Sequence, residues 1–156
     1  MKKQTTGVYL LKDNKMLFLV RHKKNDTMHK QGMYLPIGGH VELGEGAEEA
    51  AIREVKEESG VVVKSVDLRG IIYLRSQNTG DYDNIIFLFT SKDFSGEPRP
   101  GKEGKFEWVS IDEFEKINLY EGDKIFLDLL MKHEFFVVDF LYKGFELVSH
   151  KVLKVL

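Results

Sequence analysis

The sequence predicts a single α/β domain in which helices cover both faces of a mixed β-sheet. Segments typical of strands and of helices are intermixed along the 156 residues, which favours layered packing of helices on a sheet. The length is that of one ordinary domain able to bury a core. No repeat, low-complexity segment or linker interrupts residues 1–156, so we expect no second domain.

The first part of the chain predicts a hairpin followed by a glycine turn. Residues 5–11 and 16–21 are largely apolar, and the short polar segment between them favours a tight turn. A polar loop over residues 21–32 follows. Residues 34–37 then lead into the turn at Gly38-Gly39.

The next segment predicts a helix over residues 47–59. Three alanines near its start are strong helix formers, and acidic residues in its first turn complement the helix dipole. Gly60 stands where a helix ends best on a residue free to adopt positive φ.

The middle of the chain predicts further strands separated by long loops. Residues 61–75 are rich in β-branched residues and predict one or two strands. A turn-rich loop over residues 76–84 precedes the apolar run 85–90, which is typical of a buried strand. Two prolines and three glycines make residues 92–105 a long loop, and residues 106–109 predict a short strand.

The last part predicts a helix and a C-terminal hairpin. Ser110 is expected to cap a helical turn, with Glu113 at the capping-box position. Residues 123–132 predict a helix, and residues 135–142 and 145–153 predict a hairpin. The core side of that helix is expected to contain Ile125, Phe126, Leu129 and Leu130.

Three loops exceed the usual length of a connection and are candidates to line a substrate cleft. They are residues 22–33, 76–84 and 92–105.

Composition excludes several classes of function. The formal net charge of −2 gives no general attraction to nucleic acid or to an anionic membrane. The chain has no cysteine, which removes disulfides, thiolate metal sites and cysteine nucleophiles and fits a cytoplasmic setting. The five histidines share no ligand spacing, and no apolar run near the start is long enough for a signal peptide or a membrane span.

Glu54, Glu57 and Glu58 carry the candidate chemistry. Their spacing places three carboxylates on one face of the predicted helix, where like charges repel and the helix dipole disfavours anions. A divalent cation such as Mg²⁺ or Mn²⁺ would reverse both penalties. Arg53 is a cation that could fix a neighbouring carboxylate. The alternative is a solvated acidic helix face.

The segment from Gly39 to Val61 resembles the Nudix box. The resemblance rests on the identities and spacing of Gly39, Glu45, Arg53-Glu54, Val55, Glu57-Glu58, Gly60 and Val61. It implies the Nudix hydrolase fold, an α/β/α sandwich in which residues 39–61 form a loop–helix–loop. It also implies metal-dependent hydrolysis of a nucleoside diphosphate linked to another group.

The resemblance also implies roles for the residues of the box. Glu57, Glu58 and the Gly39 carbonyl are expected to bind Mg²⁺, for which Mn²⁺ is a possible substitute. Glu54 is expected to bind metal or to orient the attacking water. The expected supports of the box are Glu45 and Arg53.

Outside the box, members of this family often add one more carboxylate from a loop. Glu103 is the best-placed candidate, with an exposed loop residue as the alternative. Glu97 and Glu107 are weaker candidates, and Glu107 is expected to alternate outward along its strand. Arg21 ends a predicted strand and could reach the substrate phosphates.

Residues 34–42 resemble the MutT-type branch, whose members hydrolyse purine nucleoside triphosphates such as 8-oxo-dGTP. In that branch a late aromatic residue and a late acidic residue help to hold the purine, and Tyr120 and Asp123 occupy matching positions. Their alternatives are a core aromatic and a helix N-cap. Gly38 and Leu35 are also expected at the substrate, although Leu35 replaces the asparagine with which some members read the base.

The expected activity is therefore Mg²⁺-dependent hydrolysis of a purine nucleoside triphosphate to a monophosphate and pyrophosphate. ADP-ribose or another nucleoside diphosphate derivative is the alternative substrate, and a binding module without turnover is a more remote one. The expected partner is a small-molecule nucleotide, and the sequence favours neither a monomer nor a homodimer.

Overall fold

The fold is organised around strand β1 (Lys2–Lys12), whose side chains are buried on both faces of the sheet. Val8 and Leu10 lie in one apolar cluster and Tyr9 lies in another, and all three are fully buried. A strand with this pattern has to be covered on both sides. The computed structural model describes residues 2–22, 30–78 and 83–156.

Strands and helices follow one another in the order that the sequence predicts. After β1 come β2 (Lys15–Arg21), β3 (Tyr34–Leu35), α1 (Ala47–Ser59), β4 (Val62–Ser76), β5 (Asp83–Ser95), β6 (Gly104–Ser110), the 3₁₀ segment η1 (Ile111–Lys116), α2 (Glu121–Lys132), β7 (Phe136–Lys143) and β8 (Glu146–Val155).

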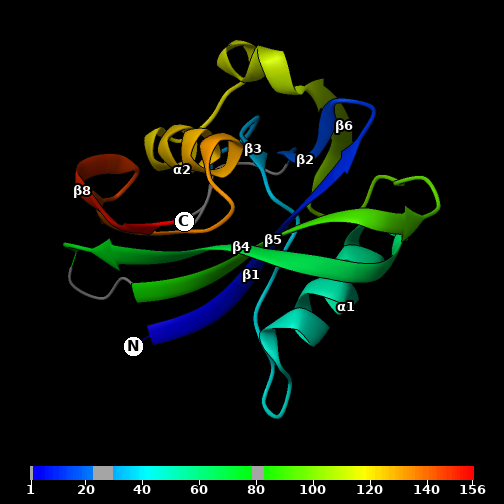
Figure 1. The fold of residues 1–156 in the computed structure, drawn as a ribbon, viewed down its shortest axis with the longest axis horizontal. Coiled ribbons are helices and arrows are strands. Elements are labelled where there is room, and N and C mark those ends of the chain that lie inside the picture. Colours follow the sequence, from blue (N-terminus) through cyan, green and yellow to red (C-terminus); the bar gives the residue numbers. More distant parts are fainter. Residues whose placement is uncertain (1, 23–29, 79–82) are drawn as a thin grey trace.

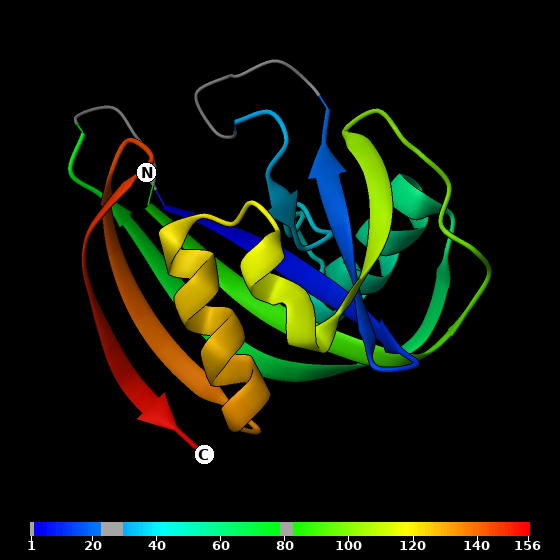
Figure 2. The same ribbon diagram turned by 90° about the horizontal axis from the view of Figure 1, so that it is seen from above.

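The sheet is mixed, as predicted. Its strands lie in the order β3-β2-β1-β5-β4-β7-β8, and β6 pairs with β2. The pairs β1–β5 and β4–β7 are parallel, and the other pairs are antiparallel. β1 and β2 pair only near their shared turn, so β2, β3 and β6 diverge from the larger set of strands (Figures 1 and 2).

The two main helices cover opposite faces of the central strands (Figure 1). Ala51 and Val55 of α1 pack in the cluster that contains Val8 and Leu10. Phe126, Leu127 and Leu130 of α2 pack in the cluster that contains Tyr9. The predicted α/β/α sandwich is therefore confirmed.

Helix α1 has the predicted bounds and β4 matches its predicted segment to within one residue, whereas β5 and β6 are longer than predicted. Residues 62–76 form one strand with register irregularities. β5 continues beyond residue 90 because Phe94 pairs with Val63 and Asp93 pairs with Ser65. The long loop therefore begins at Gly96, four residues later than the predicted start at residue 92.

Helix α2 begins at Glu121, two residues before the predicted start, and its N-cap is Tyr120. The N-cap alternative for Asp123 is therefore wrong, since this residue lies inside the first turn. The backbone N–H of Gly122 donates to the Tyr142 hydroxyl at 2.8 Å, which holds the first turn of α2 against β7. The face turned to the core contains Gly122, Phe126, Leu127 and Leu130, whereas the predicted Ile125 and Leu129 are half-buried beside it.

The remaining expectations are largely confirmed. Ser110 accepts a hydrogen bond from the Asp112 N–H at 3.4 Å, while Glu113 accepts one from Lys116 instead of closing a capping box. The C-terminal hairpin forms, with Gly144 at its turn.

Much of two predicted cleft loops, residues 23–29 and 79–82, lies outside the described residues. Over the described ranges, no helix is long and apolar enough to span a bilayer.

Candidate active site

Helix α1 is fixed at both ends, which sets the direction of its acidic face. At its start the Gly46 N–H donates to Glu49 Oε1 at 3.2 Å. At its end Gly60 has φ 81° and donates its N–H to the Lys56 carbonyl. Because Val55 is fully buried on the core side, the neighbouring acidic residues lie at the border between core and solvent.

Arg53 holds the acidic residues around it. Its Nε and Nη2 donate to the two carboxylate oxygens of Glu45, at 2.7 and 2.9 Å. Its Nη1 donates to Glu54 at 2.9 Å and to Glu57 at 3.2 Å, and its Nη2 also reaches the His40 carbonyl at 3.0 Å. The hydrogen bonds from Arg53 lower the pKa of Glu45 to about 2. The expected supporting contact between Glu45 and Arg53 is therefore present.

The two glycines before the helix bring its carboxylates close to β1. A Cβ at Gly39 would overlap the carboxylate of Glu54, so any side chain at this position would force that carboxylate to shift. The Gly39 carbonyl accepts hydrogen bonds from Thr6 N at 2.9 Å and from Thr6 Oγ1 at 3.5 Å, and so it faces β1. Successive carbonyls of an extended segment point to opposite sides, so the Gly38 carbonyl points away from β1. This geometry favours Gly38 over Gly39 as the residue whose carbonyl oxygen would bind a metal ion.

Glu58 is the least compensated carboxylate of the site. Its Oε2 atom is buried and has no hydrogen-bond partner among the described residues. Burial, together with the charges of Glu54, Glu103 and Glu57, raises the pKa of Glu58 to about 8. A further positive charge close to the Glu58 carboxylate would stabilise the folded protein.

Glu103 joins this acidic cluster from the loop between β5 and β6. The Nη1 of Arg21 donates to Glu103 Oε2 at 2.7 Å, and Arg21 is only 8% exposed. Glu97 is exposed on the same loop. Glu107 faces the α2 side of the sheet and accepts a hydrogen bond from the Tyr34 hydroxyl at 2.6 Å, so it does not point into solvent as expected.

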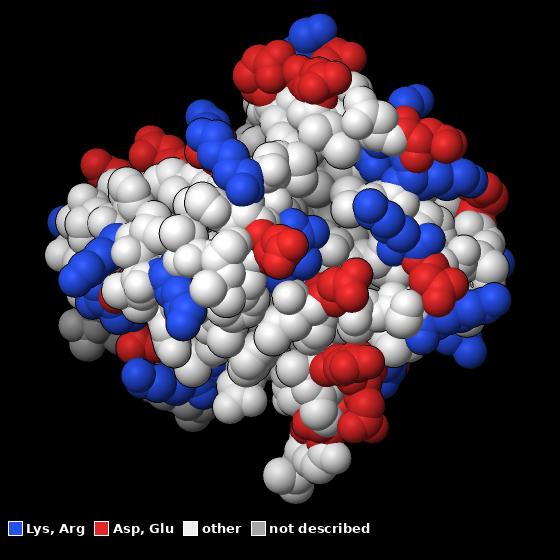
Figure 3. All heavy atoms as spheres, viewed as in Figure 1, with Lys and Arg blue, Asp and Glu red and all other residues white. Residues whose placement is uncertain are grey.

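The acidic cluster opens into a cleft of about 600 Å³. Its walls are the C-terminal half of α1 and the loop from β5 to β6, which confirms part of the predicted lining by residues 92–105. The charged residues of the cleft are Glu54, Lys56, Glu57, Glu58, Arg99, Lys102 and Glu103. On the face seen in Figure 3, both signs of charge are interspersed and acidic side chains gather over the loop before α1.

The predicted base-binding residues lie apart from this cleft. The ring of Tyr120 stacks on Phe145 with centroids 5.9 Å apart, and its hydroxyl accepts a hydrogen bond from the Lys30 N–H. Asp123 lies in the first turn of α2, where burial raises its pKa to about 7. Leu35 is 7% exposed and pairs with Leu19 on β2.

Comparison with known proteins decides the family. The model of the NUDIX domain matches residues 1–130. The chain belongs to the Nudix family. It is a hydrolase of the MutT type, in a family of pyrophosphatases that generally use a divalent metal.

Relatives of this Nudix hydrolase differ in substrate. The structure of a MutT protein from Bacillus halodurans has 27% sequence identity and a TM-score of 0.85, with 97% of each chain covered. An oxidized purine nucleoside triphosphate hydrolase from Danio rerio is 29% identical over 123 residues, which are 78% of each chain. An ADP-ribose pyrophosphatase from Methanocaldococcus jannaschii is 32% identical over 121 residues, 76% of this chain and 68% of the relative.

Arginines hold several of the candidate metal-binding carboxylates in this structure. Within the part of the chain that is described, no three acidic or histidine side chains form a ready-made metal site. Arg53 engages Glu54 and Glu57, and Arg21 engages Glu103. The side chain of Glu57 is 58% exposed, so it can turn toward a cation without unpacking the core.

Sequence reasoning missed the basic residues of the Nudix cleft. Lys56, Arg99 and Lys102 all line it. Arg99 stands between two prolines in a loop that the sequence already identified as a cleft wall. This arginine in a loop predicted to line the cleft was the signal from which a basic residue of the cleft could have been predicted.

Proposed function

We propose that this Nudix hydrolase cleaves a purine nucleoside triphosphate to a monophosphate and pyrophosphate with the help of Mg²⁺. The observation that carries the proposal is the buried, unpartnered carboxylate oxygen of Glu58 beside three further carboxylates at the wall of a cleft. A buried carboxylate without a partner is costly unless a cation compensates it.

The donor set fits a hard divalent cation. Glu58 and Glu57 would hold Mg²⁺ together with the Gly38 carbonyl, and Glu54 and Glu103 lie close enough to Glu58 to raise its pKa. Mn²⁺ has similar ligand preferences and is the expected substitute. When bound, Mg²⁺ neutralises the polyphosphate charge that otherwise repels a nucleophile.

The residues of the chain itself would orient the reaction. Arg53 fixes the rotamer of Glu54 by a 2.9 Å hydrogen bond, while its bidentate contact with Glu45 anchors the guanidinium. Glu54 is thereby held in place to accept a proton from the attacking water or to bind metal. Arg21, which ends β2 beside Glu103, would contact a substrate phosphate.

Two observations support a purine triphosphate as the substrate. The relative from Danio rerio acts on oxidized purine nucleoside triphosphates by its name. Asp123, with a pKa near 7, can both donate and accept hydrogen bonds around neutral pH, which suits the mixed donor and acceptor edge of a purine. Tyr120 lies three residues away, where its ring could contact the base, and Leu35 would provide only an apolar contact.

ADP-ribose is the second candidate. The relative from Methanocaldococcus jannaschii is an ADP-ribose pyrophosphatase by its name and has the higher identity of the two curated relatives described above. Both reactions cleave a phosphoric anhydride, so the acidic cluster serves either one. Only the binding of the remainder of the substrate would differ.

The test is a panel of dGTP, 8-oxo-dGTP, dATP, other triphosphates and ADP-ribose, incubated with Mg²⁺, with products resolved by chromatography. Glu57→Gln is the catalytic variant and Glu48→Gln, in the exposed first turn of the same helix, is its matched control. We expect monophosphate and pyrophosphate from a purine triphosphate, and at least a hundredfold loss in Glu57→Gln alone.

Other outcomes would revise the proposal in defined ways. Release of AMP from ADP-ribose with triphosphates untouched would replace the substrate but keep the acidic cluster. Full Mg²⁺-dependent turnover by Glu57→Gln would refute the assignment of that cluster.

A further inference from the structure

Arg99 differs from the other four arginines of the chain because its guanidinium has no partner among the described residues. The other arginines donate to carboxylates or to backbone carbonyls, and they are Arg21, Arg53, Arg69 and Arg75. Across residues 2–22, 30–78 and 83–156, the guanidinium of Arg99 forms no hydrogen bond or ion pair. Its charge is therefore available to a ligand.

The backbone around Arg99 is nevertheless well anchored. The Arg99 N–H donates to the Ser59 carbonyl at 2.9 Å, which ties the loop to the end of α1. The Gly101 N–H donates to the Gly104 carbonyl at 3.0 Å, which closes the loop upon itself. The anchored backbone therefore needs no reordering when the guanidinium binds an anion, and the cost of ordering is limited to the side chain.

Gly60 makes room for this guanidinium. A Cβ at Gly60 would lie 2.7 Å from Arg99 Nη2 and 3.1 Å from Arg99 Nε, so a side chain there would displace the guanidinium from its present position. Gly60 therefore does more than end the helix with positive φ, because its missing side chain lets Arg99 lie over the end of α1. Both residues line the same cleft as Glu57 and Glu58.

The position of Arg99 in the molecule indicates which part of a substrate it meets. In Figure 2 the loop from β5 to β6 lies at one end of the molecule and α2, in yellow and orange, lies on the other side of β2 and β6. Asp123 lies in α2 and Tyr120 is its N-cap, and neither residue lines the cleft that contains both the acidic cluster and Arg99. A nucleotide with its base near α2 and its anhydride at the cluster would extend its last phosphates toward Arg99.

We infer that Arg99 binds the distal phosphates of the substrate, the part that leaves as pyrophosphate. A planar guanidinium offers two parallel N–H donors that match two phosphate oxygens. This inference rests on the proposed function, since it takes the substrate to be a triphosphate cleaved at the acidic cluster.

Inorganic pyrophosphate with Mg²⁺ is the probe for the experiment. Its binding to the full-length protein is measured by calorimetry and as competitive inhibition of triphosphate turnover. Arg99→Ala should weaken pyrophosphate binding about tenfold or more, since a charge-assisted hydrogen bond is lost. Arg99→Lys should recover part of the affinity, because it keeps the charge but not the planar pair of donors.

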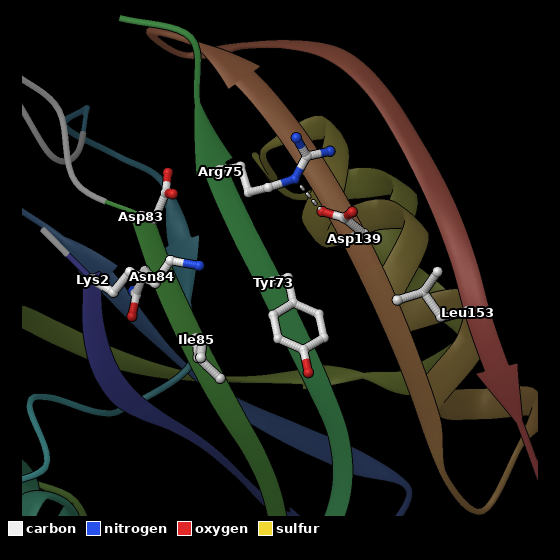
Figure 4. Close-up of a pocket in the computed structure, with 8 residues that line it drawn as sticks. All are labelled: Lys2, Tyr73, Arg75, Asp83, Asn84, Ile85, Asp139 and Leu153. Carbon is white, nitrogen blue, oxygen red and sulfur yellow. Dashed lines mark hydrogen bonds and ion pairs between the residues drawn. The ribbon is translucent and has the colours of Figure 1, made fainter. Parts of the chain in front are cut away.

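Arg75→Ala is the matched control. Arg75 lies on β4 at a separate pocket, where it is neutralised by Asp139 at 2.8 Å (Figure 4). This variant should bind pyrophosphate as the wild type does. Equal unfolding midpoints of Arg99→Ala and the wild type would exclude a merely structural effect, and a loss of affinity confined to Arg99 variants would support the inference.

Unchanged pyrophosphate affinity in Arg99→Ala would overturn the inference, as would a wild type that does not bind pyrophosphate at all. Neither result would contradict the proposed function, because that function is tested by triphosphate turnover of the wild type. Conversely, a wild type that cleaves only ADP-ribose would refute the proposed substrate, while the calorimetric titration would still report whether Arg99 binds pyrophosphate.

Discussion

Replacing Glu58 by glutamine should stabilise the metal-free protein at alkaline pH. The folded protein raises the pKa of Glu58 from its usual 4.5 to about 8, mainly through burial. That difference corresponds to at most about 5 kcal/mol of lost stability once the carboxyl is ionised. Because Glu58 is only partly buried at the wall of a cleft, solvent partly screens its charge, and about 2 to 3 kcal/mol is the expected measurable effect.

The pH window follows from the two pKa values of Glu58. Between pH 4.5 and 8 the folded state keeps a proton that the unfolded chain has already released, so raising the pH costs stability. The penalty is absent below about pH 4.5 and complete above about pH 8. Burial of Asp123 adds a similar loss between its usual 3.8 and about 7, but the wild type and Glu58→Gln share it.

The assay is urea unfolding of both proteins in EDTA at intervals from pH 5 to pH 9. The stability of Glu58→Gln relative to the wild type should rise with pH by about 2 to 3 kcal/mol. Glu48→Gln, at an exposed position of the same helix, should follow the wild type throughout. Parallel profiles of Glu58→Gln and the wild type, within about 0.5 kcal/mol, would refute the reasoning.

Three further predictions concern other residues. Arg53→Ala should lower kcat at least tenfold and make turnover depend less on Mg²⁺, because Glu54 loses the hydrogen bond that orients it. A Mg²⁺ titration of turnover measures both effects. Asp123→Asn should flatten the pH dependence of purine discrimination between pH 6 and 8, measured as the ratio of kcat/KM for a purine and a pyrimidine triphosphate. Gly60→Ala should destabilise the protein by about 1 kcal/mol in urea, because φ is 81° there; unchanged stability would contradict the strain argument.

The fold was largely predictable because its signals are local. The bounds of α1 follow from alanines, a first acidic turn and Gly60, all within one segment of the chain. The consecutive apolar residues Val8, Tyr9 and Leu10 likewise require cover on both faces of β1. Where a boundary depends on a distant partner, the prediction failed: β5 runs on to Ser95 because β4 supplies partners there.

The candidate active site shows the same difference between features set by local sequence and features set by distant contacts. Sequence alone determined the family, the helix and which carboxylates share its face, because the spacing of the Nudix box encodes them directly. Tertiary structure decided that Gly38 and not Gly39 turns its carbonyl away from β1, and that one carboxylate oxygen of Glu58 is buried. It also decided that the guanidinium of Arg99 lies over Gly60 without a partner among the described residues. Each of these features depends on segments that come into contact only when the sheet, the helix and the long loop pack together. Local sequence patterns do not encode such long-range contacts.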